Sequence, residues 1–203
     1  MRDGGRLAAA IEILADVETR HRPVKLALKS WGDASRFAGS KDRAWVSGLA
    51  LDVLRRRRSL AWRMGDDSPR AATLCALHVL WNWPVERIAE AAADAPHGPG
   101  ELTEAERAAL IAPRDLADAP PSIRGDYPEW LQPSFARAFG HDAALEGAML
   151  SERAPVDLRV NTLKTDAEQA LKALAPLNAQ PTGVLANALR IPAPDPSERS
   201  QSL

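Results

Sequence analysis

The sequence predicts a mainly α-helical protein, in which an all-α helical bundle is followed by a small α+β subdomain. Three observations lead to this prediction. Apolar residues recur at helical spacing over residues 1–93, with no strand pattern among them. Prolines and glycines then concentrate within residues 94–127. Apolar and polar residues alternate over residues 155–161, as is typical of a half-buried strand.

Five helices with short connections are predicted in the first domain, residues 1–93. Leu7, Ile11, Leu14 and Val17 share one face of the first helix. Serines precede the third and fourth helices as expected caps, and prolines suit the first turns of the second, fourth and fifth. The predicted helices span residues 5–20, 23–32, 41–58, 69–81 and 84–94, and the two capping serines are Ser40 and Ser68.

The remainder of the chain is expected to hold three further segments. Residues 94–126 form a connector with one short helix, in which Thr103 and Glu106 fit a capping box. Residues 127–192 form the α+β subdomain in the order α-α-β-α-β-β. Its second capping box is Thr165 with Glu168, and short strand-like pieces follow at 183–185 and 188–191. Residues 193–203 form a polar, proline-rich tail.

Composition excludes several classes of protein. No apolar run approaches the roughly 20 residues that a membrane span needs, and acidic residues interrupt the N-terminal segment, so neither a membrane protein nor a signal peptide is expected. The single cysteine, Cys75, excludes an internal disulfide and a cysteine-cluster metal site. The cytoplasm is the default compartment for such a chain.

The net charge of −1 conceals a marked asymmetry. Residues 20–70 hold 13 Lys and Arg against 5 Asp and Glu, a balance of +8. Residues 71–135 hold 4 against 10, a balance of −6. A basic block on a folded domain can bind a polyanion, although a solvated helix face would have the same composition.

No catalytic, cofactor-binding or metal-binding residue emerges from motif spacing. A phosphate-binding glycine loop is missing, since the GPG at 98–100 has no preceding strand. Cys75 and His78 lie in the apolar stretch TLCALHVL, where the core is a better interpretation than catalysis because a reactive thiolate needs an electropositive setting.

Tryptophans and arginines are the side chains that could recognise nucleic acid. Trp45 and Trp81 lie on apolar stripes and are expected in the core. Trp31, Trp62 and Trp83 are near helix ends, where an aromatic ring can stack on an unpaired base or be partly buried. The run Arg55 to Arg58 would point around most of a helical turn. We do not expect all four arginines to pair with acids of the same domain. Because guanidinium groups match the geometry of phosphate oxygens, unpaired arginines of this run could bind RNA.

Three segments resemble a known family. KDRAWVSGLALDVLRRRRSL at 41–60 resembles the third-helix segment of NusB-like domains in Sun/Fmu-type (RsmB-like) ribosomal RNA methyltransferases. RAPVDLRVNTLKTDAEQALKAL at 153–174 resembles the small RNA-binding subdomain of that family, and YPEWL at 127–131 resembles its entry. The three segments follow the order of the family, whereas residues 84–93 are less apolar than the usual fifth helix of a NusB-like domain.

The resemblance implies S-adenosylmethionine-dependent methylation of cytosine C5 in small-subunit ribosomal RNA. In the family, two cysteines of a following Rossmann-like domain perform the reaction. Cys75 aligns with neither, and the sequence reaches Leu203 without a cofactor glycine motif or a Pro-Cys motif. The expectation is therefore an RNA-binding portion that is inactive alone, with its own C-terminal methyltransferase domain as a further partner and S-adenosylmethionine as the cofactor of the full-length protein.

The candidate RNA contacts are basic residues of the first domain and of the small subdomain. A stand-alone NusB-like regulator of transcription antitermination, which would bind RNA and another factor, is one alternative function; RVNTLK argues against it. A purely protein-binding helical module is another. Arg43 could instead pair internally with acids, and Asn161 is expected to fix the end of the strand. The candidates are Arg20, Arg22, Lys25, Lys29, Arg43, Arg55, Arg56, Arg57, Arg58, Arg159 and Lys164.

Overall fold

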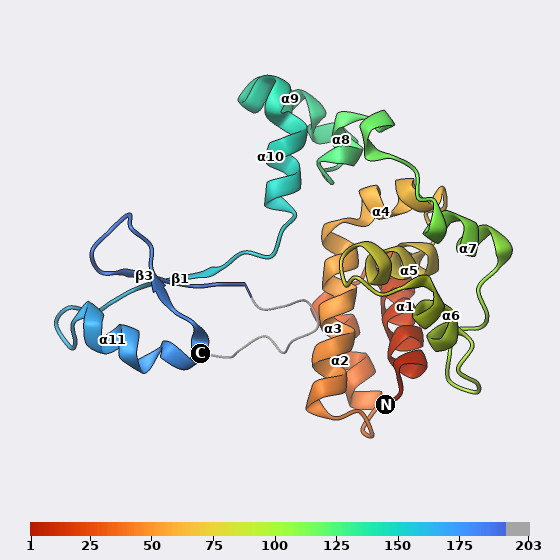
Figure 1. The fold of residues 1–203 in the computed structure, drawn as a ribbon, viewed down its shortest axis with the longest axis horizontal. Coiled ribbons are helices and arrows are strands. Elements are labelled where there is room, and N and C mark those ends of the chain that lie inside the picture. Colours follow the sequence, from red (N-terminus) through yellow and green to blue (C-terminus); the bar gives the residue numbers. More distant parts are fainter. Residues whose placement is uncertain (194–203) are drawn as a thin grey trace. The chain divides into compact units, whose positions relative to one another are not determined.

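The computed structural model describes residues 1–193, and the chain divides into two units (Figure 1). Unit 1 comprises Met1–Ser151 and is helical throughout its regular structure. Unit 2 begins at Glu152 and carries a three-stranded antiparallel sheet. The predicted fold class, a helical bundle followed by a small α+β subdomain, is confirmed.

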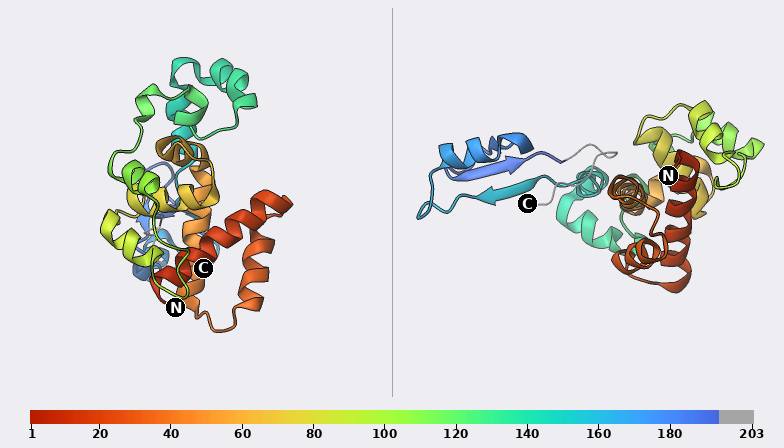
Figure 2. Two further views of the ribbon diagram at one scale, coloured as in Figure 1. Left: turned by 90° about the vertical axis from the view of Figure 1, so that its right-hand side faces the viewer. Right: turned by 90° about the horizontal axis from the view of Figure 1, so that it is seen from below.

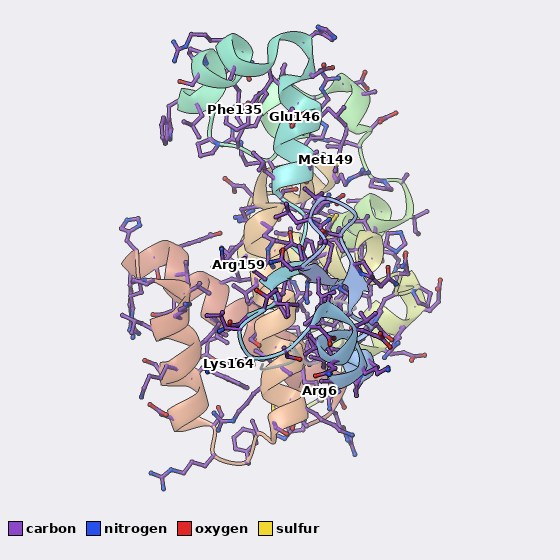
Figure 3. All side chains as sticks on the ribbon, turned by 90° about the vertical axis from the view of Figure 1, so that its left-hand side faces the viewer. Arg6, Phe135, Glu146, Met149, Arg159 and Lys164 are labelled. Carbon is purple, nitrogen blue, oxygen red and sulfur yellow. The ribbon has the colours of Figure 1, made fainter. Side chains whose placement is uncertain are left out.

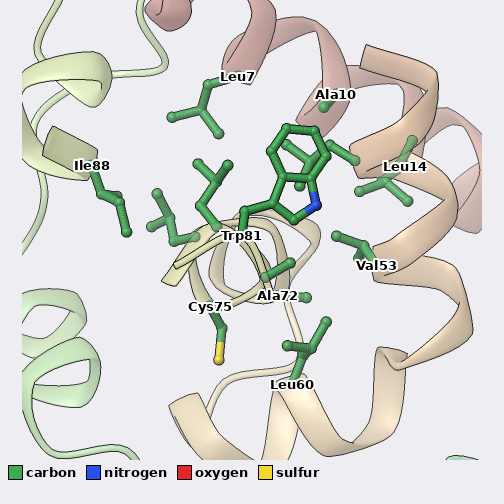
Figure 4. Close-up of a cluster of buried hydrophobic side chains, with 14 of the residues drawn as sticks. Leu7, Ala10, Leu14, Val53, Leu60, Ala72, Cys75, Trp81 and Ile88 are labelled. Carbon is green, nitrogen blue, oxygen red and sulfur yellow. The ribbon is translucent and has the colours of Figure 1, made fainter. Parts of the chain in front are cut away.

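Unit 1 is built around α1, which contacts four other helices of the bundle. Its apolar face brings Leu7 and Leu14 into the core, where both are fully buried. Leu60, Cys75 and Ile88 come from three other helices and complete the same cluster (Figure 4). The six helices of this region are α1 (Asp3–Arg20), α2 (Val24–Ala34), α3 (Ser40–Arg55), α4 (Arg57–Met64), α5 (Pro69–Val79) and α6 (Val85–Ala92).

The predicted third helix is wrong at both ends. It begins at Ser40 itself, and the preceding Gly39 is the cap residue, whose amide donates to the Asp42 carboxylate at 3.1 Å. It ends at Arg55, because Arg56 leaves helical geometry (φ −119°, ψ 27°) and a separate helix, α4, follows. Residues 1–93 therefore hold six helices where the sequence predicts five.

A residue distant in sequence caps the N-terminus of α4. One carboxylate oxygen of Asp126 accepts from the amides of Arg58 and Ser59 at 3.0 and 2.8 Å, and the other accepts from the Ser59 hydroxyl at 2.6 Å. The amides of Arg58 and Ser59 lie at a helix N-terminus, where backbone donors have no partner within the helix. A side-chain oxygen of the adjacent cap residue ordinarily accepts from such amides. The helix break within the arginine run thus has a physical cause in Asp126.

Residues 94–126 carry more structure than the single predicted helix. The capping box of Thr103 with Glu106 is confirmed at the start of α7 (Glu104–Ile111). Two short segments follow, η1 (Leu116–Asp118) and α8 (Pro121–Arg124). Leu110 is buried in the bundle core, and α8 contacts α4.

Helical structure continues to the end of unit 1 in four segments. Tyr127 is buried and stacks on Phe135 with ring centroids 4.1 Å apart, and Phe135 meets Phe139 edge-on at 5.5 Å. Trp130 is 76% exposed. The segments are η2 (Glu129–Leu131), α9 (Gln132–Phe139), η3 (Gly140–Asp142) and α10 (Ala143–Leu150).

Unit 2 has the strand order β1-β3-β2. β1 (Val156–Arg159) pairs with β3 (Ala188–Ile191), Val156 lying opposite Ile191. α11 (Ala167–Ala173) contacts β3 and is followed by η4 (Ala175–Leu177) (Figure 2). β2 is Gln180–Pro181, and the strand expected at 183–185 is not formed because Gly183 adopts a left-handed φ of +74°.

The cap of α11 also differs from the prediction. Its cap residue is Asp166, whose carboxylate accepts from the Gln169 amide at 2.8 Å. Thr165, the predicted cap, lies one residue earlier. Both residues can cap a helix, and the sequence pattern alone does not distinguish adjacent cap positions.

Candidate RNA-binding surface

Three of the predicted cations at the start of the basic segment have acidic partners. Arg20 and Arg22 both contact the Asp16 carboxylate, at 3.2 and 3.0 Å. Lys29 pairs with Asp33 at 2.7 Å on an exposed helix face. The exposed pair of Lys29 contributes little to stability and can exchange one partner for another, so it leaves this cation available to a phosphate. Arg22 is partly buried and also donates to the Ser30 hydroxyl at 2.9 Å.

Arg43 has a structural role in unit 1. Its guanidinium donates to the carbonyls of Ala38 at 3.0 Å, Gly32 at 2.7 Å and Ser35 at 3.3 Å. The alternative that Arg43 pairs internally with acids is therefore corrected. Its hydrogen-bond partners within the described residues are carbonyls, and these bonds join the end of α2 to the start of α3. Gly32 permits the approach, since a Cβ there would lie 2.3 Å from the guanidinium.

The arginine run straddles the break between α3 and α4 and is half-buried throughout. Arg55 pairs with Asp52 at 3.3 Å, and Arg57 with Glu18 at 2.6 Å. Burial raises the pKa of Asp126. Hydrogen bonds from Ser59 and the nearby charge of Arg56 lower it, but by less. The Nε of Arg58 is buried and has no hydrogen-bond partner. The four side chains thus have four different environments.

Exposed cations without such partners lie on α2 and around the start of α3. Lys25 was predicted from the sequence, whereas Arg36 and Lys41 were missed although both belong to the basic block. None of the three side chains has an ion pair or hydrogen bond in the described part of the chain. The signal that could have found Arg36 and Lys41 is their position beside a helix start, where side chains project into solvent.

Unit 2 presents its predicted cations at the end of β1 (Figure 3). Arg159 and Lys164 are both exposed. Asn161 forms the turn between them: its side-chain oxygen accepts from the Leu163 amide at 3.1 Å, and its carbonyl accepts from the Lys164 amide at 2.9 Å. The turn leaves Leu163 96% exposed beside these cations.

The tryptophans of unit 1 separate into core and partly exposed residues. Trp45 and Trp81 meet edge-on at 5.0 Å, and the Trp81 indole donates to Asp52 at 3.0 Å, so the predicted core positions are confirmed. Trp83 is also buried, against Trp45. Trp31 and Trp62 are half-buried.

Cys75 and His78 lie on α5 and have the environment of packed residues. Cys75 is 1% exposed, and burial raises its pKa to about 12. His78 is half-buried, less than predicted, with Nδ1 2.9 Å from the Trp83 carbonyl. Within residues 1–193, no cluster of His, Cys, Asp and Glu could hold a metal ion, and no helix is long and apolar enough to span a membrane.

Comparison with known families bears on the second part of the chain. Residues 127–197 match the ferredoxin-like domain of RsmF/RsmB-like methyltransferases. The matched region contains β1, α11, β3 and the exposed Arg159 and Lys164. It also includes α9 and α10, which belong by their contacts to unit 1. No curated protein matches the chain.

Proposed function

We propose that this chain is the RNA-binding portion of an S-adenosylmethionine-dependent methyltransferase acting on cytosine C5 of small-subunit ribosomal RNA in the cytoplasm. The match of residues 127–197 to a domain of RsmF/RsmB-like methyltransferases is the observation that carries the proposal. In the proposal, residues 1–93 are a NusB-like domain, residues 94–126 connect it to the matched domain, and a methyltransferase domain is the functional partner of both.

The charge distribution supports a phosphate-contacting role for both units. Lys25, Arg36 and Lys41 are exposed in unit 1, and Arg159 and Lys164 in unit 2. Contacts of this kind position an RNA without reading its sequence, because phosphates carry no base identity. Arg43 and the ion-paired Arg55 and Arg57 support the fold of unit 1 in this proposal.

Direct binding tests the proposal. The chain should bind small-subunit ribosomal RNA fragments at low salt, and Arg159→Gln combined with Lys164→Gln should weaken binding by about tenfold, the loss expected when two phosphate contacts are removed. Lys172→Gln is the matched control, since this lysine of α11 already pairs with Glu168 at 2.8 Å. Absence of RNA affinity in the parent chain would contradict the proposal.

The 203-residue chain alone is not expected to transfer a methyl group. The family resemblance implies two catalytic cysteines, and the sequence contains one, which is buried with a raised pKa. Incubation with radiolabelled S-adenosylmethionine and ribosomal RNA should leave the RNA unlabelled. Labelling that disappears in Cys75→Ser would show that the core assignment of this thiol is wrong.

A further inference from the structure

A cavity of about 890 Å³ opens beside α4, at the arginine run. Arg57, Arg58 and Trp62 line it from α4, Glu18 from α1, and Arg114 and Ile123 from the segments before and within α8. All of these residues belong to unit 1. The volume falls within the range of about 300–1,000 Å³ typical of small-molecule sites, and the cavity is wide open to solvent.

Most charges around this cavity are already engaged. Glu18 is neutralised by Arg57 at 2.6 Å, and Arg57 also donates to the carbonyl of Asp67. Asp66 accepts from the Ser68 amide at 2.8 Å. Within the described residues, the guanidinium groups of Arg58 and Arg114 have no acidic partner, and the carboxylate of Asp67 lines the same cavity. The lining is therefore formally neutral, with three arginines and three acids, and two of its arginines have no acidic partner in the described part of the chain to hold them.

Two details of the wall concern Arg58 and Arg114. The Arg58 Nε–H is buried and unsatisfied, which costs free energy unless an acceptor reaches it. Arg114 lies so close to Gly65 that a Cβ there would be 2.5 Å from its guanidinium. Gly65, at φ +65°, ends α4 and lets the arginine approach.

Trp62 supplies an aromatic surface in the same cavity. Its indole Nε1 donates to the Asp115 carbonyl at 3.0 Å, which fixes the orientation of the ring while the residue stays partly exposed. An aromatic face beside two guanidinium groups has the chemistry that recognises a base together with its phosphate.

We infer that this cavity binds one unpaired nucleotide of the RNA, with the phosphate on Arg58 and Arg114 and the base stacked on Trp62. The inference rests on the proposed function, since it names the site at which unit 1 would distinguish single-stranded from paired RNA. Neither Trp62 nor Arg114 is needed for the bundle core, so both can be replaced without removing a buried contact of that cluster.

The test compares a fluorescent oligouridylate with a blunt-ended RNA duplex by anisotropy, using the full chain. Trp62→Leu should weaken oligouridylate binding about tenfold, because stacking is lost, and leave duplex binding unchanged. Arg114→Gln should flatten the dependence of log affinity on log salt by about 0.7 for the oligouridylate. Arg107→Gln, a change on α7 outside the cavity, should alter neither quantity.

Competition separates the nucleotide from a simple anion. Uridine monophosphate should displace the oligouridylate from the parent at lower concentration than inorganic phosphate does, and this advantage should vanish in Trp62→Leu. Equal displacement by the two probes would overturn the stacking role of Trp62.

Two further outcomes separate failure of the cavity from failure of the proposed function. Parent-like binding by both cavity variants, with unchanged circular dichroism, would overturn the cavity while leaving RNA binding by the chain intact. A parent chain that binds neither RNA would overturn both.

Discussion

Cys75 shows how burial decides the chemistry of a single residue. The thiol is 1% exposed and burial raises its pKa to about 12, so the neutral thiol is the form present at pH 8. We expect Ellman's reagent to leave the native chain unmodified and to modify one thiol per chain in urea. Rapid modification of the native chain would contradict the buried position.

Glu106 makes the stability of unit 1 sensitive to acid. Burial opposes its charge, but hydrogen bonds from Arg70, at 2.6 Å, and from the Thr103 amide outweigh burial and hold the pKa below its ordinary 4.5. A carboxyl group whose pKa is depressed by folding stabilises the fold above its unfolded pKa, and this contribution is lost as pH falls through the folded pKa.

Glu106→Gln should therefore lower stability near neutral pH and reduce the further loss between about pH 5 and pH 2. Urea denaturation at a series of pH values measures both effects. Glu104→Gln, an exposed neighbour on α7, serves as the control and should leave the pH dependence unchanged. Identical pH profiles for the parent and Glu106→Gln would contradict this explanation.

Residues on apolar stripes could be predicted from sequence, because periodicity identifies the face of a helix that packs. Trp45, Trp81 and Cys75 are the examples here. Partners distant in sequence could not be predicted. Glu18 lies 39 residues from Arg57, and no local pattern relates the two.

At the scale of elements, Asp126 explains why one predicted helix is two. It caps α4 from 67 residues away, so the break in the arginine run has no local signal. Lys25, Arg159 and Lys164 were predicted as RNA contacts and are exposed, whereas Arg36 and Lys41, beside a helix start in the same basic block, were missed. In unit 2 the sequence does not determine the conformation of Gly183, because the left-handed φ seen there is one of several conformations open to glycine.

Asp126→Ala should destabilise unit 1 by about 1–3 kcal/mol, because it leaves the Arg58 and Ser59 amides without their acceptor. The midpoint of urea unfolding measures the change. Asp118→Ala is the matched control, an exposed acid in η1 whose side chain makes no hydrogen bond in the described residues. Equal midpoints for the two variants would show that the remote cap contributes nothing.

At the scale of the molecule, basic residues are distributed over both units although the net charge is −1. The block of +8 over residues 20–70 contains internally engaged arginines as well as exposed cations, so sequence charge overstates the number of phosphate contacts that unit 1 can make. Lys25, Arg36 and Lys41 are exposed cations of this block that have no partner among residues 1–193.

The salt dependence of RNA binding tests the central claim most directly. Each lost phosphate contact flattens the slope of log affinity against log salt by about 0.7 for single-stranded RNA, so replacing Lys25, Arg36 and Lys41 by glutamine should flatten it by about 2. Replacing the exposed Glu101 and Glu104 by glutamine should leave the slope unchanged. An unchanged slope and affinity in the triple cation variant, with helical circular dichroism preserved, would contradict RNA binding through this surface.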